Sequence, residues 1–511
     1  MKRPMLTLLA CALFGSFSFA QDAKESTALT IYSSAQPGAV PAELYQPGAS
    51  ASQIYGPMWR TQIPGYAIVK QERTFPLGAG RSKIRFTDVA SQIEPTTVKF
   101  SSLTDPTGTR ILEQSFEFDL VNQSRLLSHF LDRVITVNGT KGTLLSSSMD
   151  AGTVRVILRE ANGDVRIMNG AGDVVLPELP PNLITRPTLV WDVATDKPGD
   201  HRTRVTYETK ALTWWTDYNL VFAEGKDANS GLLDVGAWVS ILNQSGATYN
   251  DAKLKLIAGD VQRAPEPSPA PMRSHRMTGK VMAAAEMDAG FEEKTFFEYH
   301  LYTLGRPTTI ADNSTKQVEL FPPAKDVPCE KVLVYYGLGT KYPNYGNPMT
   351  DRNFGVQSNQ KVDIYLKFKN EKAIGMGMPL PTGRIRVSKL DPADGTLEFI
   401  GEDTIDHTAK DETVLIKLGS AFDVVGERKQ TDFAVDSTRK WIDEKIEIKV
   451  RNHKDEKVKV IVKENLYRWT NWKITEKTSE FEKVDSRTIH FPLEIEKDGE
   501  ATIRYTVHYS W

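Results

Sequence analysis

The amino-acid sequence predicts an all-β protein with one short helix. The first observation behind this prediction is a strict alternation of apolar and polar residues, the period of a strand with one buried face. It recurs along the chain and is longest at its end. There, the residues on the apolar face are Ile503, Tyr505, Val507, Tyr509 and Trp511.

Turn chemistry and the scarcity of helical periodicity are the other two observations. Asn162-Gly163, Asp394-Gly395 and Asp498-Gly499 accept positive φ and close hairpins between the alternating runs. Helical spacing is continuous only from Asn122 to about Arg133. The residues expected on the apolar face of that helix are Leu126, Leu127, Phe130 and Leu131.

The first twenty residues resemble a signal peptide. Lys2 and Arg3 precede an apolar run, which ends in the small-x-small pattern of Ser18-Phe19-Ala20. We therefore expect cleavage after Ala20 and a periplasmic or secreted protein. A lipid anchor on Cys11 is the alternative, because Leu8 to Cys11 loosely resembles a lipoprotein box. No later apolar run is long enough for a transmembrane helix.

Charge and cysteine content limit the kinds of partner and of cross-link that we expect. The formal net charge of the 511 residues is −2, and no long basic stripe occurs, so no nucleic-acid partner is expected. Cleavage after Ala20 would remove Cys11 and leave Cys329 as the one remaining cysteine, so no internal disulfide is expected. Hydrophobic cores must then supply the stability.

Shifts in composition predict the domain boundaries. The most distinct linker is 262–294, where Pro265, Pro267, Pro269 and Pro271 alternate with other residues. Such a composition cannot bury a core, so it predicts a disordered loop, either functional or a tolerated surface insertion. Five short strands within 134–178 predict a small SH3-like or Sm-like barrel. The full division is a signal peptide at 1–20, an extended arm at 21–62, a β domain with the helix at 63–133, the barrel at 134–178, a β-sandwich at 179–261, the loop at 262–294, a second sandwich at 295–436 and an immunoglobulin-like domain at 437–511.

Several stretches carry a resemblance to a known family. They are Trp215–Leu220, Ala237–Val239, Asn243–Tyr249, Leu254–Val261, Tyr299–Tyr302, Pro379–Arg384, Asn452–Lys454, Tyr467–Trp469 and Tyr505–Val507. Through them the chain, from about Leu29 onward, resembles the domain of unknown function 4139 family of bacterial exported proteins, which includes mucoidy-inhibitor-like members. The resemblance implies a β-rich envelope protein and no particular reaction. Longer members contain a coiled coil in the N-terminal half, and no heptads occur here.

Motifs of catalysis and metal binding are missing from the sequence. There is no G-x-S-x-G elbow and no H-E-x-x-H, and no two of the eight histidines lie within five positions of each other. Asp227, Asn229 and Gly231 loosely resemble a calcium loop without its distal Glu, which favours a solvated turn. We therefore predict no catalytic, cofactor or metal site.

Two groups of aromatic residues are the candidate site. They are Trp214, Trp215 and Tyr218 in one group, and Tyr467, Trp469 and Trp472 in the other. On a strand, Tyr467 and Trp469 would share a face and could stack on sugar rings, although core packing is the commoner role. The sequence thus favours a non-enzymatic scaffold or interaction protein of the cell envelope. A glycan-binding protein is the alternative, and the partner, an envelope protein or a polysaccharide, and the oligomeric state stay open.

Overall fold

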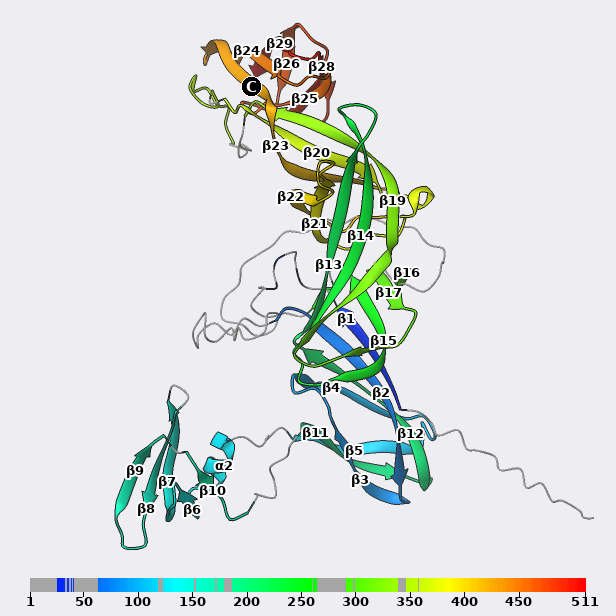
Figure 1. The fold of residues 1–511 in the computed structure, drawn as a ribbon, viewed down its shortest axis with the longest axis vertical. Coiled ribbons are helices and arrows are strands. Elements are labelled where there is room, and N and C mark those ends of the chain that lie inside the picture. Colours follow the sequence, from blue (N-terminus) through cyan, green and yellow to red (C-terminus); the bar gives the residue numbers. More distant parts are fainter. Residues whose placement is uncertain are drawn as a thin grey trace, which may run out of the picture. The chain divides into compact units, whose positions relative to one another are not determined.

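The computed structural model describes most of the chain and confirms the all-β class. The described residues are 25–32, 35, 38, 40, 63–117, 123–150, 153–170, 172–178, 186–259, 261–263, 291–296, 299–338, 346–356 and 358–511. Within these ranges the regular structure consists of strands, one α-helix and one 3₁₀ turn (Figure 1). The predicted signal peptide with Cys11, most of the arm at 21–62 and most of the loop at 262–294 lie outside the described residues.

Two compact units make up the chain. Unit 1 contains Lys70–Val89 and Pro95–Tyr207, and unit 2 contains Ala28–Val69, Ala90–Glu94 and Glu208–Trp511. The predicted segments 295–436 and 437–511 both belong to unit 2. No helix among the described residues has the length and apolar character needed to cross a bilayer.

Unit 1 packs around aromatic rings from three of its strands. Trp191 is buried and contacts Phe86 and Phe100 at ring distances of 5.5 and 5.2 Å. Its indole nitrogen donates a hydrogen bond to the Gln114 side chain at 2.7 Å, so the buried polar atom is satisfied. The strands of this part of unit 1 are β2 (Tyr66–Leu77), β3 (Gly80–Thr87), β4 (Ile93–Ser102), β5 (Thr109–Glu117), β11 (Thr188–Thr195) and β12 (Gly199–Lys210). β11 lies between β3 and β5, and β12 lies between β2 and β4.

The predicted small barrel corresponds to an open sheet. Its order is β10-β6-β7-β8-β9, and no pairing among the described residues joins β10 to β9. A closed barrel is therefore not observed, and the SH3-like or Sm-like fold stays a prediction. The elements are α2 (Gln123–His129), β6 (Val134–Val137), β7 (Thr140–Asp150), β8 (Thr153–Arg159), β9 (Val165–Asn169) and β10 (Val174–Val175).

Helix α2 is shorter than the periodicity predicts. After His129 the backbone makes three-residue turn bonds, from the amide of Phe130 to the carbonyl of Leu127 and from Arg133 to Phe130. Asp132 then takes a φ of +61°, which ends helical geometry. Leu127 and Phe130 are buried as expected, but Leu131 is 43% exposed, because it lies beyond the helix.

Unit 2 contains two sheets. In the smaller, the strands follow the order β16-β17-β15-β1-β2, where β2 contributes its first residues, up to Val69. Strand β1 pairs in parallel with β15 from Ala28 opposite Lys253 to Tyr32 opposite Ile257. Strand β18 also pairs with β15. Besides β2, the strands of this smaller sheet are β1 (Ser26–Tyr32), β15 (Tyr249–Ala258), β16 (Phe291–Phe296), β17 (Tyr299–Leu304) and β18 (Thr308–Ile310).

The larger sheet has thirteen strands among the described residues, and its main path is β22-β21-β13-β14-β19-β20-β23-β24-β29-β26. Strand β25 pairs with β19 and β28, and β27 pairs with β28. The bounds are β13 (Leu212–Glu224), β14 (Ser230–Asn243), β19 (Ser314–Tyr336), β20 (Lys361–Lys369), η2 (Lys372–Ile374), β21 (Gly383–Leu390), β22 (Leu397–Ile405), β23 (Thr413–Asp436), β24 (Trp441–Asn452), β25 (Val458–Asn465), β26 (Trp472–Lys477), β27 (Glu482–Lys483), β28 (Thr488–Ile495) and β29 (Glu500–Ser510).

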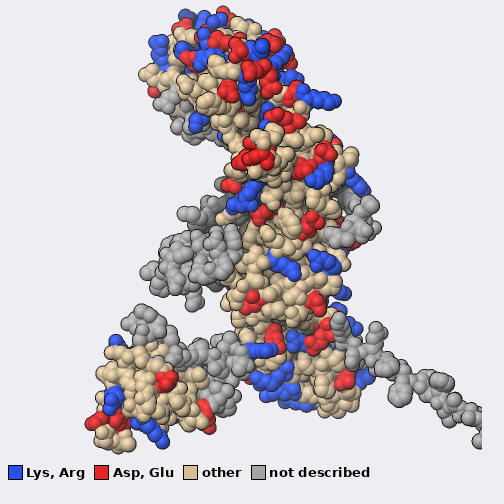
Figure 2. Space-filling model, viewed as in Figure 1, with Lys and Arg blue, Asp and Glu red and all other residues tan. Residues whose placement is uncertain are grey.

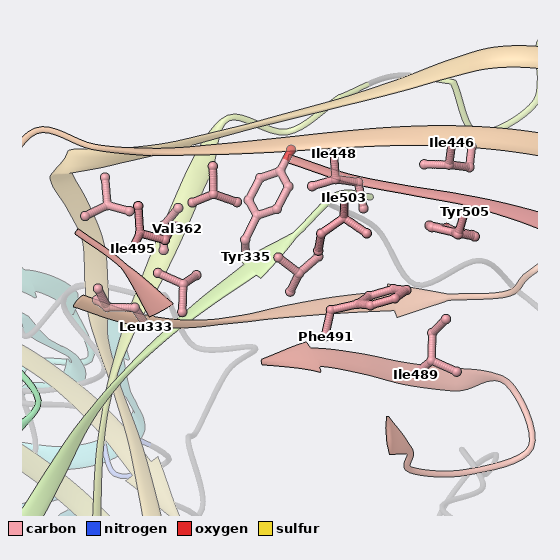
Figure 3. Packing of buried hydrophobic residues seen from close by; sticks show 14 of the residues in the cluster. Leu333, Tyr335, Val362, Ile446, Ile448, Ile489, Phe491, Ile495, Ile503 and Tyr505 are labelled. Atoms are coloured by element: carbon pink, nitrogen blue, oxygen red, sulfur yellow. The ribbon is translucent and has the colours of Figure 1, made fainter. Parts of the chain in front are cut away.

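A large apolar core lies at the C-terminal end of unit 2. Side chains from β19, β20, β24, β28 and β29 point toward one another there, with Tyr335, Phe491 and Tyr505 among them (Figure 3). The face predicted from alternation is buried, since Ile503 and Val507 are both 0% exposed. On the outside of β24 to β29, charged side chains of both signs are intermixed (Figure 2).

Candidate functional site

A polar pocket lies on one face of the larger sheet. It is a cavity of about 210 Å³ at β13, β14, β19 and β21, which are neighbours in the sheet. The residues that line it are Gly38, Val40, Trp215, Thr216, Asp217, Ser240, Thr315, Gln317, Arg384 and Arg386. Small-ligand sites are concave, and a few precisely placed polar groups in them fix the orientation of the ligand.

Strand alternation decides which side chains reach this face. In β13, Trp214 and Tyr218 are each 1% exposed and point into the core, whereas Trp215 and Asp217 are half-buried on the opposite face. The first predicted aromatic group is therefore divided between two faces. Because adjacent strand residues point in opposite directions, Trp214, Trp215 and Tyr218 cannot form one aromatic surface.

The ladder register continues this face across four strands. Asp217 lies beside Arg384 in the parallel ladder of β13 and β21, and opposite Trp238 in the antiparallel ladder of β13 and β14. Trp238 in turn lies opposite Glu319 of β19. Residues paired across neighbouring strands share a face. Trp238, which is 39% exposed, therefore extends the pocket face beyond Asp217.

Asp217 orients the side chains around it. One carboxylate oxygen accepts a hydrogen bond from the Trp215 indole nitrogen at 2.8 Å, and the other lies 3.5 Å from an Arg386 nitrogen. Arg386 also lies 3.7 Å from Glu402 of β22. The pairing holds the Trp215 ring in one orientation and leaves Asp217 charge-balanced. The ring also packs against a small apolar cluster that contains Val40 and Leu242.

Two buried tyrosines anchor the start of β21. The hydroxyl of Tyr218 donates to the carbonyl of Pro381 at 2.7 Å, and that of Tyr302 donates to the carbonyl of Pro379 at 2.9 Å. Burial raises the pKa of both Tyr218 and Tyr302 well above the usual value, so both stay protonated donors. These bonds position the turn that leads into Arg384 and Arg386.

Gly383 allows β21 to lie against β13. A Cβ at this position would come within 2.5 Å of the Thr216 carbonyl oxygen and 2.7 Å of the Tyr218 ring. Only glycine fits this approach, and Arg384 follows it directly. The segment Pro379–Arg384, which the sequence singled out for its resemblance, is thus the element that brings an arginine to the pocket.

Arg384 and Arg386 differ in their acidic neighbours. No acidic side chain among the described residues lies within ion-pair distance of it, whereas Arg386 has both Asp217 and Glu402. Gly38, with φ of +77°, lies against the guanidinium, and a Cβ there would come within 3.2 Å of Nη2. The described lining therefore has one cation in excess, at Arg384.

The second predicted aromatic group does not form an exposed surface. β25 ends at Asn465 and β26 begins at Trp472, so Tyr467 and Trp469 lie in a connection and the prediction that they share a strand face is wrong. Tyr467 is buried and donates to the Phe354 carbonyl at 2.8 Å. Trp469 and Trp472 are half-buried at the margin of the C-terminal core.

Buried ion pairs beside this connection were not predicted. Arg428 and Glu464 lie 3.0 Å apart with side chains 3% and 0% exposed, and Arg468 and Glu444 lie 3.1 Å apart with 0% and 1%. The Tyr505 hydroxyl donates to Glu464. Burial opposes the charge of Arg428, but Glu464 holds its pKa well above the usual value. Nothing in the alternation pattern distinguishes such residues from solvated charges on a strand.

The guanidinium of Arg468 also binds a loop backbone. It donates to the carbonyls of Met349 at 2.9 Å, Asp351 at 2.7 Å and Phe354 at 3.0 Å. This clasp, defined as Arg468 with those three carbonyls, ties the segment before β20 to the connection after β25. Its role is structural, because the guanidinium is buried and all three acceptors are backbone carbonyls.

Unit 1 contains a serine–histidine pair that sequence reasoning missed. Ser102 Oγ lies 3.0 Å from His201 Nδ1, and His201 Nε2 lies 2.7 Å from the carbonyl of Lys197. Nε2 must donate to that carbonyl, and in a neutral imidazole Nδ1 then accepts from the Ser102 hydroxyl. Both residues are 1% exposed, and among the described residues the imidazole bonds hydroxyls and a backbone carbonyl rather than the carboxylate of a hydrolase triad. The pair therefore serves packing. Among the described residues no cluster of His, Cys, Asp or Glu could hold a metal ion.

Comparison with known proteins yields no relative: no protein-family model, curated protein or solved structure matches the chain. The resemblance to the domain of unknown function 4139 family stays a prediction from the stretches quoted above.

Proposed function

We propose that the chain is a binding protein of the bacterial cell envelope and that the pocket face of the larger sheet binds an oligosaccharide. The observation that supports this most is the presence of two indoles, Trp215 and Trp238, beside Asp217, Arg384 and Gln317 on one face. Aromatic rings stack on the apolar faces of sugar rings, while carboxylate, amide and guanidinium groups hydrogen-bond to hydroxyls.

Binding without catalysis fits the chemistry of the lining. Glycoside hydrolysis uses two carboxyl groups on either side of the bond that breaks. Among the described lining residues Asp217 is the one carboxylate, and its two oxygens face Trp215 and Arg386. A carboxylate held in this way is suited to orienting neighbours rather than to transferring a proton.

The envelope location rests on the sequence. The predicted signal peptide with cleavage near Ala20 and the resemblance to exported proteins both support it. We also infer that the paired sheets form sandwich-like units, because aromatic rings of β3 and β11 contact rings of β2 and β4 in unit 1.

A protein partner is a second candidate, favoured by exposed apolar side chains on β22 and β23. Phe399 is 61% exposed and Phe422 is 95% exposed. Leu390 and Leu397, opposite each other at the end of the β21–β22 hairpin, are 50% and 56% exposed. Exposed apolar groups of this kind are typical of protein–protein contacts, which suits a scaffold.

Affinity electrophoresis through gels that contain bacterial envelope polysaccharide tests the proposed function. We expect wild-type protein to be retarded and Trp238→Ala to migrate freely, because the variant loses the exposed ring on the pocket face. Trp472→Ala is the matched control, since Trp472 lies on β26 outside the pocket and should bind as the wild type does. Equal retardation of wild type and Trp238→Ala, or none for either, would overturn the proposal.

A further inference from the structure

We infer that the pocket selects an acidic sugar, whose carboxylate binds Arg384. This inference rests on the proposed function, because it names the class of saccharide that the same face takes. In this inference Arg384 binds the ligand, whereas Arg386 forms ion pairs within the protein.

Charge pairing distinguishes the two arginines. Arg386 lies within ion-pair distance of Asp217 at 3.5 Å and of Glu402 at 3.7 Å, so its charge is compensated by the sheet itself. Arg384, two residues earlier on the same strand, has no acidic partner among the described residues, although it lines the same pocket. A half-buried cation without a counterion attracts an anion more strongly than a solvated surface charge does.

The guanidinium of Arg384 is held in place, and no side chain at Gly38 covers it. Tyr218 fixes Pro381, and Gly383 brings β21 against β13, so the backbone of Arg384 is firmly positioned. On the other side, Gly38 contributes no side chain, and its φ of +77° disfavours any replacement that would cover Nη2. Gly38 therefore leaves room beside Nη2 that a Cβ would take up.

The chemistry of the remaining lining favours a sugar acid over an acidic peptide. A guanidinium binds a planar carboxylate through two parallel hydrogen bonds. Around it, Ser240, Gln317 and Thr315 offer hydroxyl and amide groups, and Gln317 already bonds Ser240 at 3.1 Å in a preorganised pair. With the Trp215 indole as a flat wall, this set matches a ring that has several hydroxyls and one carboxylate.

Isothermal titration with paired ligands tests the inference. The probes are sugar acids, each with its neutral parent, such as glucuronate with glucose and galacturonate with galactose, so that the two members differ at one carbon. We expect the acid of at least one pair to bind wild-type protein about 10- to 100-fold more tightly than its parent, the range of one charge-assisted interaction. Arg384→Gln should abolish this preference, so that acid and parent bind the variant with affinities within about twofold of each other.

Two further variants control for charge and position. Arg384→Lys retains the charge without the planar fork and should recover part of the preference. Lys389→Gln removes a cation on the same strand that pairs with Glu224 outside the pocket, and should bind as the wild type does.

Each contrary outcome has a definite meaning. Equal affinity for acid and parent in every pair would refute the acidic-sugar inference while the proposed function stands. Absence of binding by every saccharide would refute both. A preference that survives in Arg384→Gln would refute the role of Arg384. Tighter binding of tetraglutamate, or of glucose 6-sulfate, than of every sugar acid would replace the carboxylated sugar with a different class of ligand.

Discussion

Arg428 and Glu464 place opposite charges where water does not reach. Removing a charge from water costs several kcal/mol, and the Coulomb attraction offsets this only when further hydrogen bonds complete the pair. Tyr505 supplies one such bond to Glu464. Gly337 leaves room for the pair, since a Cβ there would come within 2.5 Å of Glu464. The arrangement is therefore complete only when all four residues are present, and its cost makes each one hard to replace alone.

The free energy of unfolding should depend on pH through the thiol of Cys329. Burial raises the pKa of its thiol from 9.0 to about 11, against a small opposing effect of Lys331. The folded protein thus favours the neutral thiol, and the unfolded chain loses the proton first. This contribution to stability is complete below pH 9 and is lost as pH rises from 9 to 11.

Urea unfolding at several alkaline pH values measures this loss. We expect the unfolding free energy of the wild type to fall more steeply between pH 9 and 11 than that of Cys329→Ala. The variant has a lower stability throughout, so the slope and not the absolute value is compared. Parallel slopes would show that the thiol contributes nothing in this range.

Strand β21 depends on its contact with β13. The parallel ladder between them joins segments that are far apart in the sequence, from Thr216 opposite Gly383 to Phe222 opposite Lys389. Parallel strands need a long crossover, so the register cannot come from a hairpin turn and must come from side-chain packing and fixed hydrogen bonds. Tyr218, Tyr302 and Gly383 supply these at the first rungs of the ladder.

Gly383→Ala should therefore disturb the pocket, although Gly383 is not one of the lining residues. The new Cβ would be forced against the Thr216 carbonyl, and overpacking of this kind typically costs about 1–3 kcal/mol. We expect a lower melting temperature and weaker saccharide binding in calorimetry, because Arg384 moves with the strand.

Gly236→Ala is the matched control for this substitution. The nearest atom to its Cβ would be the Asn219 carbonyl oxygen at 3.7 Å, an ordinary contact, so stability should stay within about 0.5 kcal/mol of wild type. Equal losses in the two variants would mean that the close approach at Gly383 has no special importance.

The molecule as a whole shows what alternation can and cannot predict. Period two correctly assigns which residues of one strand share a face, as for Ile503 to Tyr509. It contains no information on which strands become neighbours, so the pairings of β1 with β15 and of β13 with β21 could not be predicted. Trp215 was a candidate, but Arg384 and Trp238 join it only through ladders that link distant strands.

The aromatic candidates illustrate the same limit. Closeness in sequence groups Trp214 and Tyr218 with Trp215, although adjacent strand residues face opposite sides. The spacing of two between Tyr467 and Trp469 predicts a shared strand face, but Tyr467 and Arg468 instead bind the carbonyls of a remote loop. Hydrogen bonds between a side chain and a remote backbone leave no periodic trace in a sequence.

Limited proteolysis tests a prediction about the whole chain. The proline- and methionine-rich composition of 262–294 predicts the first cleavage within this segment, because few of its residues can join a core. The strands on either side, β15 and β16, both pair with β17. We therefore expect two fragments on a denaturing gel that elute together in size-exclusion chromatography. Separate elution, or first cleavage elsewhere, would contradict this expectation.

The clasp of Arg468 has a consequence for how the chain can vary. Its three acceptors are backbone carbonyls of Met349, Asp351 and Phe354, which every amino acid possesses. Replacing those side chains leaves the acceptors in place, whereas deleting or inserting a residue shifts them out of reach of a fixed guanidinium. The amino-acid sequence of this loop can therefore vary, whereas its length cannot.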